Sequence, residues 1–310
     1  MLNVAPGVAG WIGSARKALA AVGGALADYA RLVRLHRPVG IWLLLWPALW
    51  ALWIAASGHP DEHVFVVFTL GVLLTRSAGC ALNDYADRNF DPHVVRTAGR
   101  PLAAGRVSPA EALLICAILS LLALALVLTL DRLTVEYAIA GAALTLVYPF
   151  LKRFFPLPQV WLGAAFSWSV PMAFAAQTGQ VPRLAWLLFA AGVLWTAVYD
   201  TLYAMVDRDD DLKLGIRSSA ILFGDADRWV IAAMQLLVLY ALWLADRQAQ
   251  LGRWSELALA AGAGLFAWQQ RLIRAREREQ CLRAFRNNHW FGLAIFLGIL
   301  LDYLFKRGGA

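Results

Sequence analysis

The feature that most constrains this chain is a series of apolar runs, each long enough to cross a bilayer. A helix of about 20 apolar residues spans the ~30 Å of hydrocarbon, and it satisfies its own backbone hydrogen bonds there. Hydrophobic residues make up 60% of the chain and charged residues only 16%, which excludes an ordinary soluble domain. The runs predict an all-α integral membrane protein with nine transmembrane helices in a single bundle around a central cavity, at about residues 39–57, 63–82, 110–130, 134–150, 158–176, 184–204, 227–245, 255–270 and 289–305.

The first 38 residues differ from the rest because charges recur among their apolar residues. Residues 12–37 have an amphipathic pattern that is typical of a helix lying in the membrane interface, and Pro38 breaks this pattern. A signal peptide is not indicated, since Arg16 and Lys17 follow the apolar part instead of preceding it. We therefore expect an N-terminal interfacial segment over residues 1–38 and a nine-helix transmembrane domain over residues 39–310.

The basic residues are distributed unequally between the two ends of the predicted bundle. The segments at one end carry 21 of the 28 Lys and Arg residues and those at the other end carry six, while Arg76 lies inside a run. Loops that retain Lys and Arg face the cytoplasm, so this bias predicts a cytoplasmic N-terminus. The net charge of +7 is then explained by basic loops that meet anionic lipid, and no nucleic-acid partner is expected.

Two acidic stretches follow apolar runs at the basic end of the bundle. The first holds three polar residues at i, i+4 and i+8 of a helix, which would form one ridge: Asn83, Asp87 and Asp91. The second lies over a hundred residues later and repeats the helical spacing in Asp200, Tyr203, Asp207 and Asp211. Because both stretches open on the same face of the membrane, we expect them to share one site.

The residue types of these stretches indicate a hard divalent cation. Carboxylates placed side by side repel one another unless cations neutralise them, and no Cys or His accompanies them at ligand spacing. Mg²⁺ is held in proteins by one or two carboxylates together with substrate phosphates. Two such ridges facing one cavity therefore predict a diphosphate between them.

Arg76 is the one full charge within the second predicted span, about residues 63–82. It lies two helical turns before Asn83, which places it on the same helix face as the first acidic ridge. An arginine inside the membrane is costly and usually faces a polar interior. We therefore expect Arg76 to bind substrate.

The spacings of both acidic stretches resemble the paired motifs of the UbiA superfamily of intramembrane aromatic prenyltransferases. The matching patterns are Asn83-Asp-x-x-Asp87-x-x-x-Asp91 and Asp207-x-x-x-Asp211. Within that superfamily the chain is similar to the branch that prenylates 4-hydroxybenzoate, through the segments Leu35-His-Arg37-Pro38-Val-Gly40, Arg100-Pro-Leu, Tyr199-Asp-Thr-Leu-Tyr203 and Ala220-Ile-Leu-Phe-Gly224.

The resemblance implies a reaction, a cofactor and a location. The expected reaction transfers a polyprenyl group from polyprenyl diphosphate to C3 of 4-hydroxybenzoate, with Mg²⁺, in ubiquinone biosynthesis. The expected location is the bacterial inner membrane with the active site on the cytoplasmic side, or the mitochondrial inner membrane.

Ionisation of an allylic diphosphate requires cations that stabilise the departing negative charge. We expect two Mg²⁺ ions, one held by Asn83, Asp87 and Asp91 and the other by Asp207 and Asp211. Basic residues near the two stretches are expected to contact the diphosphate directly: Arg88, Lys152, Arg153 and Lys213.

The prenyl cation and the acceptor need further groups. The π-faces of Tyr148 and Tyr203 would stabilise the allylic cation, and Asp200 or Asp207 would accept the proton that the ring carbon loses. The carboxylate of the acceptor would bind an arginine, for which the candidates are Arg34, Arg37 and Arg153.

Two other readings of the sequence remain open at this point. A secondary transporter would also carry intramembrane acids and broken helices, but it predicts acids near mid-span, whereas these lie at span ends. A prenyltransferase for another acceptor, such as a naphthoate, homogentisate or haem, would share the same motif spacing.

Overall fold

The computed structural model describes residues 22–94, 96–151, 155, 157–215 and 217–306, and these contain helices and connecting loops but no strand. Residues 22–32 are helical and lead into a turn. The following α-helices are α2 Val39–Ala55, α3 Glu62–Asp87, α4 Pro109–Val127, α5 Arg132–Leu151, α6 Pro158–Ser167, α7 Ser169–Thr178, α8 Arg183–Leu214, α9 Ser219–Phe223, α10 Asp227–Gln248, α11 Arg253–Leu272 and α12 Arg278–Lys306. Short 3-10 helices lie at Asp91–His93, Gly224–Ala226 and Ile273–Ala275.

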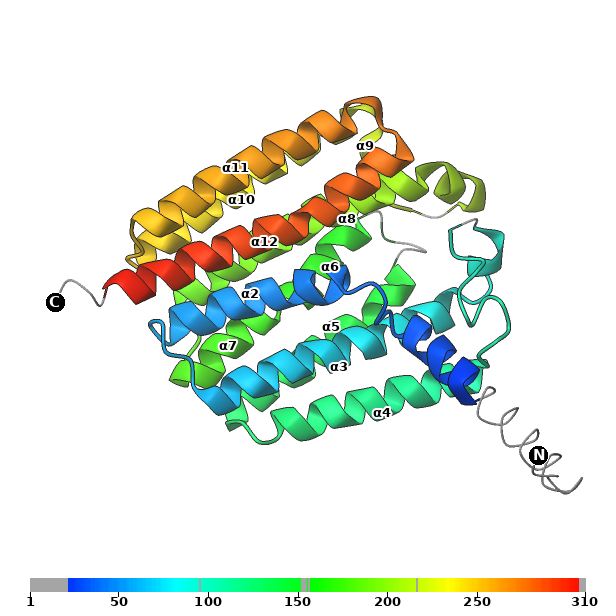
Figure 1. The fold of residues 1–310 in the computed structure, drawn as a ribbon, viewed down its shortest axis with the longest axis horizontal. Coiled ribbons are helices and arrows are strands. Elements are labelled where there is room, and N and C mark those ends of the chain that lie inside the picture. The colour runs from blue at the N-terminus through cyan, green and yellow to red at the C-terminus, as the bar shows by residue number, and fades with distance from the viewer. Residues whose placement is uncertain (1–21, 95, 152–154, 156, 216, 307–310) are drawn as a thin grey trace, which may run out of the picture.

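The helices form one bundle in which α2 lies between α3 and α12 (Figure 1). Within the part of the chain that the structure describes, six helical segments are long and apolar enough to cross a membrane: α3, α4, α5, α8, α9 continued by α10, and α12. The other three predicted spans coincide with α2, with α6 followed by α7, and with α11. The all-helical membrane architecture expected from the sequence is therefore confirmed.

Local sequence explains where several helices begin and end. Ser108 caps α4 by accepting a hydrogen bond from the backbone of Glu111, whose side chain accepts one from the backbone of Ser108 in return. The span over 158–176 is interrupted at Trp168, between α6 and α7. Pro171 accounts for its place, because a proline cannot donate to the carbonyl four residues earlier.

The second acidic stretch is helical throughout, whereas the first is not. Helix α8 continues to Leu214, so that the whole second stretch is helical. Helix α3 ends at Asp87, and Asp91 begins a separate 3-10 helix. The prediction of one continuous ridge is therefore wrong at Asp91. The reason is local: Asp91 precedes Pro92, and the residue before a proline is disfavoured in an α-helix.

Aromatic residues and glycines fix how closely the helices pack. Trp50 and Trp195 are fully buried and lie with ring centroids 5.1 Å apart, joining α2 to α8. At Gly163 of α6, a Cβ would lie only 2.7 Å from the carbonyl oxygen of Val193 in α8, so only glycine permits this approach. The helices around the cavity are thus held at set distances.

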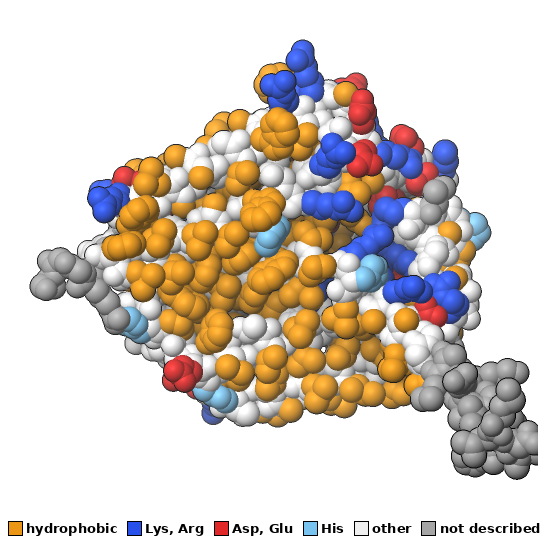
Figure 2. Space-filling view, viewed as in Figure 1, with side chains coloured by type: hydrophobic (Ala, Val, Ile, Leu, Met, Phe, Trp, Pro, Cys, Tyr) orange, Lys and Arg blue, Asp and Glu red, His pale blue; other side chains and the backbone are white. Residues whose placement is uncertain are grey.

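Hydrophobic side chains also cover much of the outer surface. Figure 2 shows them across the middle of one face, while Lys and Arg gather at one end. Large apolar side chains of α4 and α5 are more than half exposed, among them Leu114, Leu121 and Ile139. A surface of this kind suits contact with lipid tails and not with water.

Candidate active site

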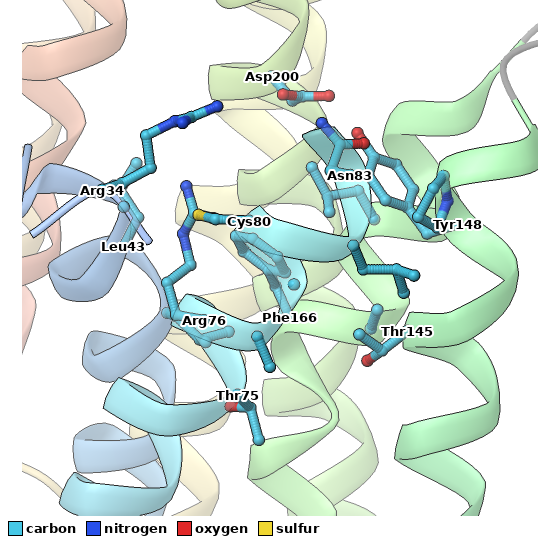
Figure 3. A pocket seen from close by; sticks show the side chains of 18 of the residues that line it. Arg34, Leu43, Thr75, Arg76, Cys80, Asn83, Thr145, Tyr148, Phe166 and Asp200 are labelled. Atoms are coloured by element: carbon cyan, nitrogen blue, oxygen red, sulfur yellow. The ribbon is translucent and has the colours of Figure 1, made fainter. Parts of the chain in front are cut away.

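A cavity of about 980 Å³ opens in the bundle and receives side chains from α2 to α8 and from the loop after α3. Much of its wall is apolar, and Leu43 and Phe166 are among the side chains on it (Figure 3). Carboxylates and arginines concentrate toward the end where α3 terminates, and we call this part the acidic end. An apolar chamber with a charged end suits a ligand that has a hydrocarbon part and an anionic part.

Both acidic stretches reach this one cavity. Asn83 and Asp87 come from α3, Asp91 comes from the loop, and α8 contributes Asp200, Tyr203, Asp207 and Asp211. Figure 3 shows Asn83 and Asp200 at the same end of the cavity, with Tyr148 of α5 beside them. The expected convergence of two distant stretches is present in the structure.

Arg96 binds the second acidic stretch across the cavity. Its Nε and Nη2 donate to the two carboxylate oxygens of Asp207 at 2.8 and 2.5 Å, and its Nη1 donates to the hydroxyl of Tyr203. The guanidinium also lies 4.8 Å from the centre of the Tyr203 ring. Burial lowers the pKa of Arg96, but Tyr203 and Asp207 outweigh it and raise that pKa above its ordinary value. This arginine is therefore a permanent cation at the acidic end.

A second set of ion pairs joins the first acidic stretch to the N-terminal turn. Asp84 accepts from Nη1 and Nη2 of Arg34 at 3.1 and 2.6 Å. It also accepts from Nη1 of Arg100 at 3.0 Å, and the same nitrogen donates to Asp91 at 2.8 Å. Burial, together with Asp87 and Asp84, raises the pKa of Asp91 despite the opposing effect of Arg100.

Arg76 lies deeper, where the wall is apolar. Its Nη1 donates to Sγ of Cys80, and its buried Nε has no hydrogen-bond partner among the described residues. Gly40 of α2 makes room for it, since a Cβ there would lie 2.6 Å from that nitrogen. Arg76 is half-buried and lines the cavity, where a guanidinium is suited to bind an anion.

The remaining candidates fall into three groups. Arg37 and Tyr148 line the cavity as expected. Arg88 and Lys213 are exposed and are absent from its described lining. Lys152 and Arg153 lie outside the described residues. The diphosphate contact expected of Arg88 finds no support in its position, since its guanidinium donates to the carbonyl of Tyr85 and stacks on that ring.

Sequence reasoning missed Arg96, Arg100 and Asp84 as site residues. The two arginines are four residues apart and follow the first acidic stretch, but their loop has no periodicity from which a direction could be assigned. Asp84 adjoins Asn83 and lies at the edge of the face that carries Asn83 and Asp87, so the helical period does not assign it to the cavity.

The donors at the acidic end suit Mg²⁺. They are carboxylate and amide oxygens, which hard cations prefer, and the nearby thiol of Cys80 is engaged by Arg76. Among the described residues, no three His, Cys, Asp or Glu side chains form a ready-made metal site. A hard cation here would therefore share its coordination between these side chains and ligand phosphates.

The chain is similar in sequence to a family of known enzymes. The sequence profile of the UbiA prenyltransferase family matches residues 44–295. A 4-hydroxybenzoate octaprenyltransferase of Alkalilimnicola ehrlichii is 58% identical over 275 residues, which cover 89% of this chain and 94% of that protein. The protein of the same name from Coxiella burnetii is 58% identical over 278 residues, covering 90% and 97%.

The fold is also similar to that of solved proteins. A UbiA homolog from Aeropyrum pernix K1, 27% identical, superposes with a TM-score of 0.74 over 85% of this chain and 97% of that one. A UbiA homolog from Archaeoglobus fulgidus, solved bound to GPP and Mg²⁺, is 16% identical and has a TM-score of 0.65 over 88% and 99%.

Proposed function

Because this chain belongs to the UbiA prenyltransferase family, we propose that its cavity joins a polyprenyl group to an aromatic acid. The protein is an integral membrane prenyltransferase that transfers a polyprenyl group from polyprenyl diphosphate to 4-hydroxybenzoate and releases diphosphate. The new bond forms at C3 of the acceptor, as a step of ubiquinone biosynthesis. The observation that carries this function is the meeting of both acidic stretches in one cavity whose deeper walls are apolar.

The metal site is proposed from the donors on each side of the cavity. Asn83, Asp87 and Asp91 hold one Mg²⁺, and Asp207 and Asp211 hold a second. Bound Mg²⁺ supplies positive charge that stabilises the departing diphosphate. The positions of these residues in the cavity support the assignment, as does the GPP and Mg²⁺ complex of a protein with the same fold.

The arginines at the acidic end are the proposed direct contacts to the diphosphate. Arg96 and Arg100 line the cavity and hold guanidinium groups beside the carboxylates of both stretches. Arg153 and Lys152, which lie outside the described residues, remain proposed contacts on the grounds of their sequence position.

The acceptor lies deeper, beside Arg76. The guanidinium of Arg76 is suited to receive the acceptor carboxylate, and Arg34 and Arg37 line the mouth through which the acceptor passes. The ring faces of Tyr148 and Tyr203 stabilise the allylic cation while apolar walls exclude water.

The proton released from the ring carbon needs an acceptor. Asp200 is the better placed base, because both oxygens of the other candidate, Asp207, receive hydrogen bonds from Arg96. The electron pair of that C–H bond restores the aromatic ring after the new C–C bond has formed.

The topology is proposed from hydropathy and charge. Residues 39–310 form nine membrane crossings, in which α6 and α7 together make one, and the helix over residues 22–32 lies along the interface. The rest of the expected interfacial segment, residues 1–21, lies outside the described residues. The Lys and Arg bias supports a cytoplasmic acidic end in a bacterial inner membrane, with the mitochondrial inner membrane as the alternative.

Turnover by isolated membranes tests this function. Membranes that contain the chain are supplied with labelled 4-hydroxybenzoate, GPP and Mg²⁺, and the expected product is the 3-prenylated acid. Asp87→Ala and Asp207→Ala are each expected to lower turnover by a factor of about 10³ or more, as loss of electrostatic stabilisation does. Prenylation of a naphthoate or homogentisate instead would reassign the acceptor, and failure with every acceptor would refute the function.

A further inference from the structure

Asp84 belongs to the first acidic stretch, but unlike Asn83, Asp87 and Asp91 it does not line the cavity. Successive residues of a helix are turned by about 100°, so Asp84 lies at the edge of the face that Asn83 and Asp87 present. Its side chain is 0% exposed, and it is absent from the described lining of the cavity. The stretch therefore contains a carboxylate that the proposed metal site does not use.

The partners of Asp84 are two arginines that do line the cavity. Arg34 forms a two-pronged contact with it, and Arg100 bridges it to Asp91. These contacts engage Nη1 and Nη2 of Arg34 but only Nη1 of Arg100. A guanidinium carries five N–H donors, so each arginine keeps donors for a ligand in the cavity.

The backbone conformation at Arg34 is a second, independent indication that its surroundings hold this residue in place. The helix over residues 22–32 ends in a turn in which Leu35 N–H bonds to Ala30 O at 3.0 Å and Arg34 N–H bonds to Arg31 O at 3.1 Å. Glycine is preferred at the Arg34 position of this turn, because φ is positive there, and Arg34 has φ of 62°. A non-glycine residue persists in this strained conformation only where its surroundings hold it.

We propose that Asp84 is a positioning residue that holds the guanidinium groups of Arg34 and Arg100 at the cavity edge, where they bind the diphosphate of the prenyl substrate. This inference rests on the proposed function. The acidic stretch then has two roles. Asn83, Asp87 and Asp91 bind Mg²⁺, while Asp84 positions the guanidinium groups of the two arginines. The same arrangement gives the N-terminal turn, far from Asp84 in sequence, a place in substrate binding.

Asp84→Asn tests the proposal, with Asp87→Asn as the matched variant one turn away on the same helix. Asp84→Asn is expected to raise the KM for GPP by about 10- to 100-fold, as the loss of a residue that orients a ligand does, with kcat changed much less. When GPP is absent, Mg²⁺ is expected to protect Asp84→Asn from thermal unfolding at the same concentration as it protects the wild type. Asp87→Asn is expected to abolish that protection.

Each result bears on the inference. A wild-type KM for Asp84→Asn would overturn it, even if the melting temperature fell, because the role would then be structural only. Loss of Mg²⁺ protection in Asp84→Asn would make Asp84 a metal ligand and would also overturn it. An inactive wild-type protein would instead refute the proposed function.

Arg34→Gly and Arg100→Gln keep the inference testable if Asp84→Asn fails to fold. Glycine relieves the positive φ at position 34, which offsets part of the stability lost with the ion pair to Asp84, and Arg34→Gly is expected to raise the KM for GPP. Arg100→Gln is expected to raise the same KM. If neither substitution changes it, the inference fails.

Discussion

At the scale of the residue, the acidic end is already partly neutralised by the chain's own arginines. Asp207 is paired with Arg96, and Asp84 and Asp91 are paired with Arg100. A buried carboxylate without a partner would be strongly destabilising, so these pairs explain how acidic stretches persist beside apolar walls. A divalent cation that enters the site must compete with guanidinium groups.

The first prediction concerns that competition at Asp207. Arg96→Gln removes the donor pair from both carboxylate oxygens, so we expect Mg²⁺ alone to bind more tightly, by about tenfold if one charge-assisted interaction is relieved. The measurement is the Mg²⁺ concentration that gives half of the maximal thermal protection. Arg88→Gln is the control, because Arg88 belongs to the same loop but binds only Tyr85 among the contacts observed. Weaker Mg²⁺ binding in Arg96→Gln would refute the competition.

The second prediction concerns the space for Arg76. Gly40→Ala places a Cβ 2.6 Å from the guanidinium and must displace it. We expect the KM for 4-hydroxybenzoate to rise about tenfold or more, since the acceptor carboxylate loses one charge-assisted contact, while the KM for GPP changes little. Gly264→Ala is the control, because nothing lies within 4 Å of the added atom. Equal acceptor KM values in the two variants would contradict the assignment of Arg76.

At the scale of the element, α12 shows how polar residues join helices inside the bundle. The buried amide of Asn288 accepts a hydrogen bond from Nε1 of Trp195 in α8 at 2.9 Å and donates to the carbonyl of Ala284 at 3.0 Å. Its neighbour His289 is bonded to Trp46 of α2. Helices in lipid gain no hydrophobic drive toward each other, so such contacts specify their packing.

The third prediction follows from the Asn288 contact. Asn288→Ala leaves the buried indole N–H of Trp195 unsatisfied, which costs about 1–3 kcal/mol. We expect a lower melting temperature in detergent, with Mg²⁺ protection retained. Leu297→Ala on the same helix is the comparison, because Leu297 is 42% exposed. A melting temperature equal to that of the wild type would show that the Trp195 contact contributes nothing.

The elements themselves were largely predictable, since apolar runs of bilayer length have few folded alternatives. Their ends were less so. The prediction that the span ends near residue 204 missed ten further residues of α8, because a charged run leaves no hydropathy signal for a helix that continues beyond the lipid. The ridge prediction failed at Asp91 because the proline after it outweighs the helical spacing.

At the scale of the whole molecule, the sequence predicted that the two acidic stretches share one cavity. It did not predict which arginines pair with them there. Periodicity assigns Asp87 and Asp207 to helix faces, and the Lys and Arg bias assigns both stretches to one membrane side. The loop arginines Arg96 and Arg100 carry no such signal, because a loop has no repeating direction. Arg88 was expected at the site from proximity in sequence, which does not determine where a side chain points.

The central claim is that both acidic stretches bind one diphosphate through Mg²⁺, and GPP binding in Asp87→Asn and Asp207→Asn tests it most directly. Thermal protection by GPP is measured with and without Mg²⁺ in each variant, in the double variant and in the wild type. We expect protection of the wild type only when Mg²⁺ is present, its loss in either single variant, and no further loss in the double variant. Full Mg²⁺-dependent protection in either single variant would contradict the claim.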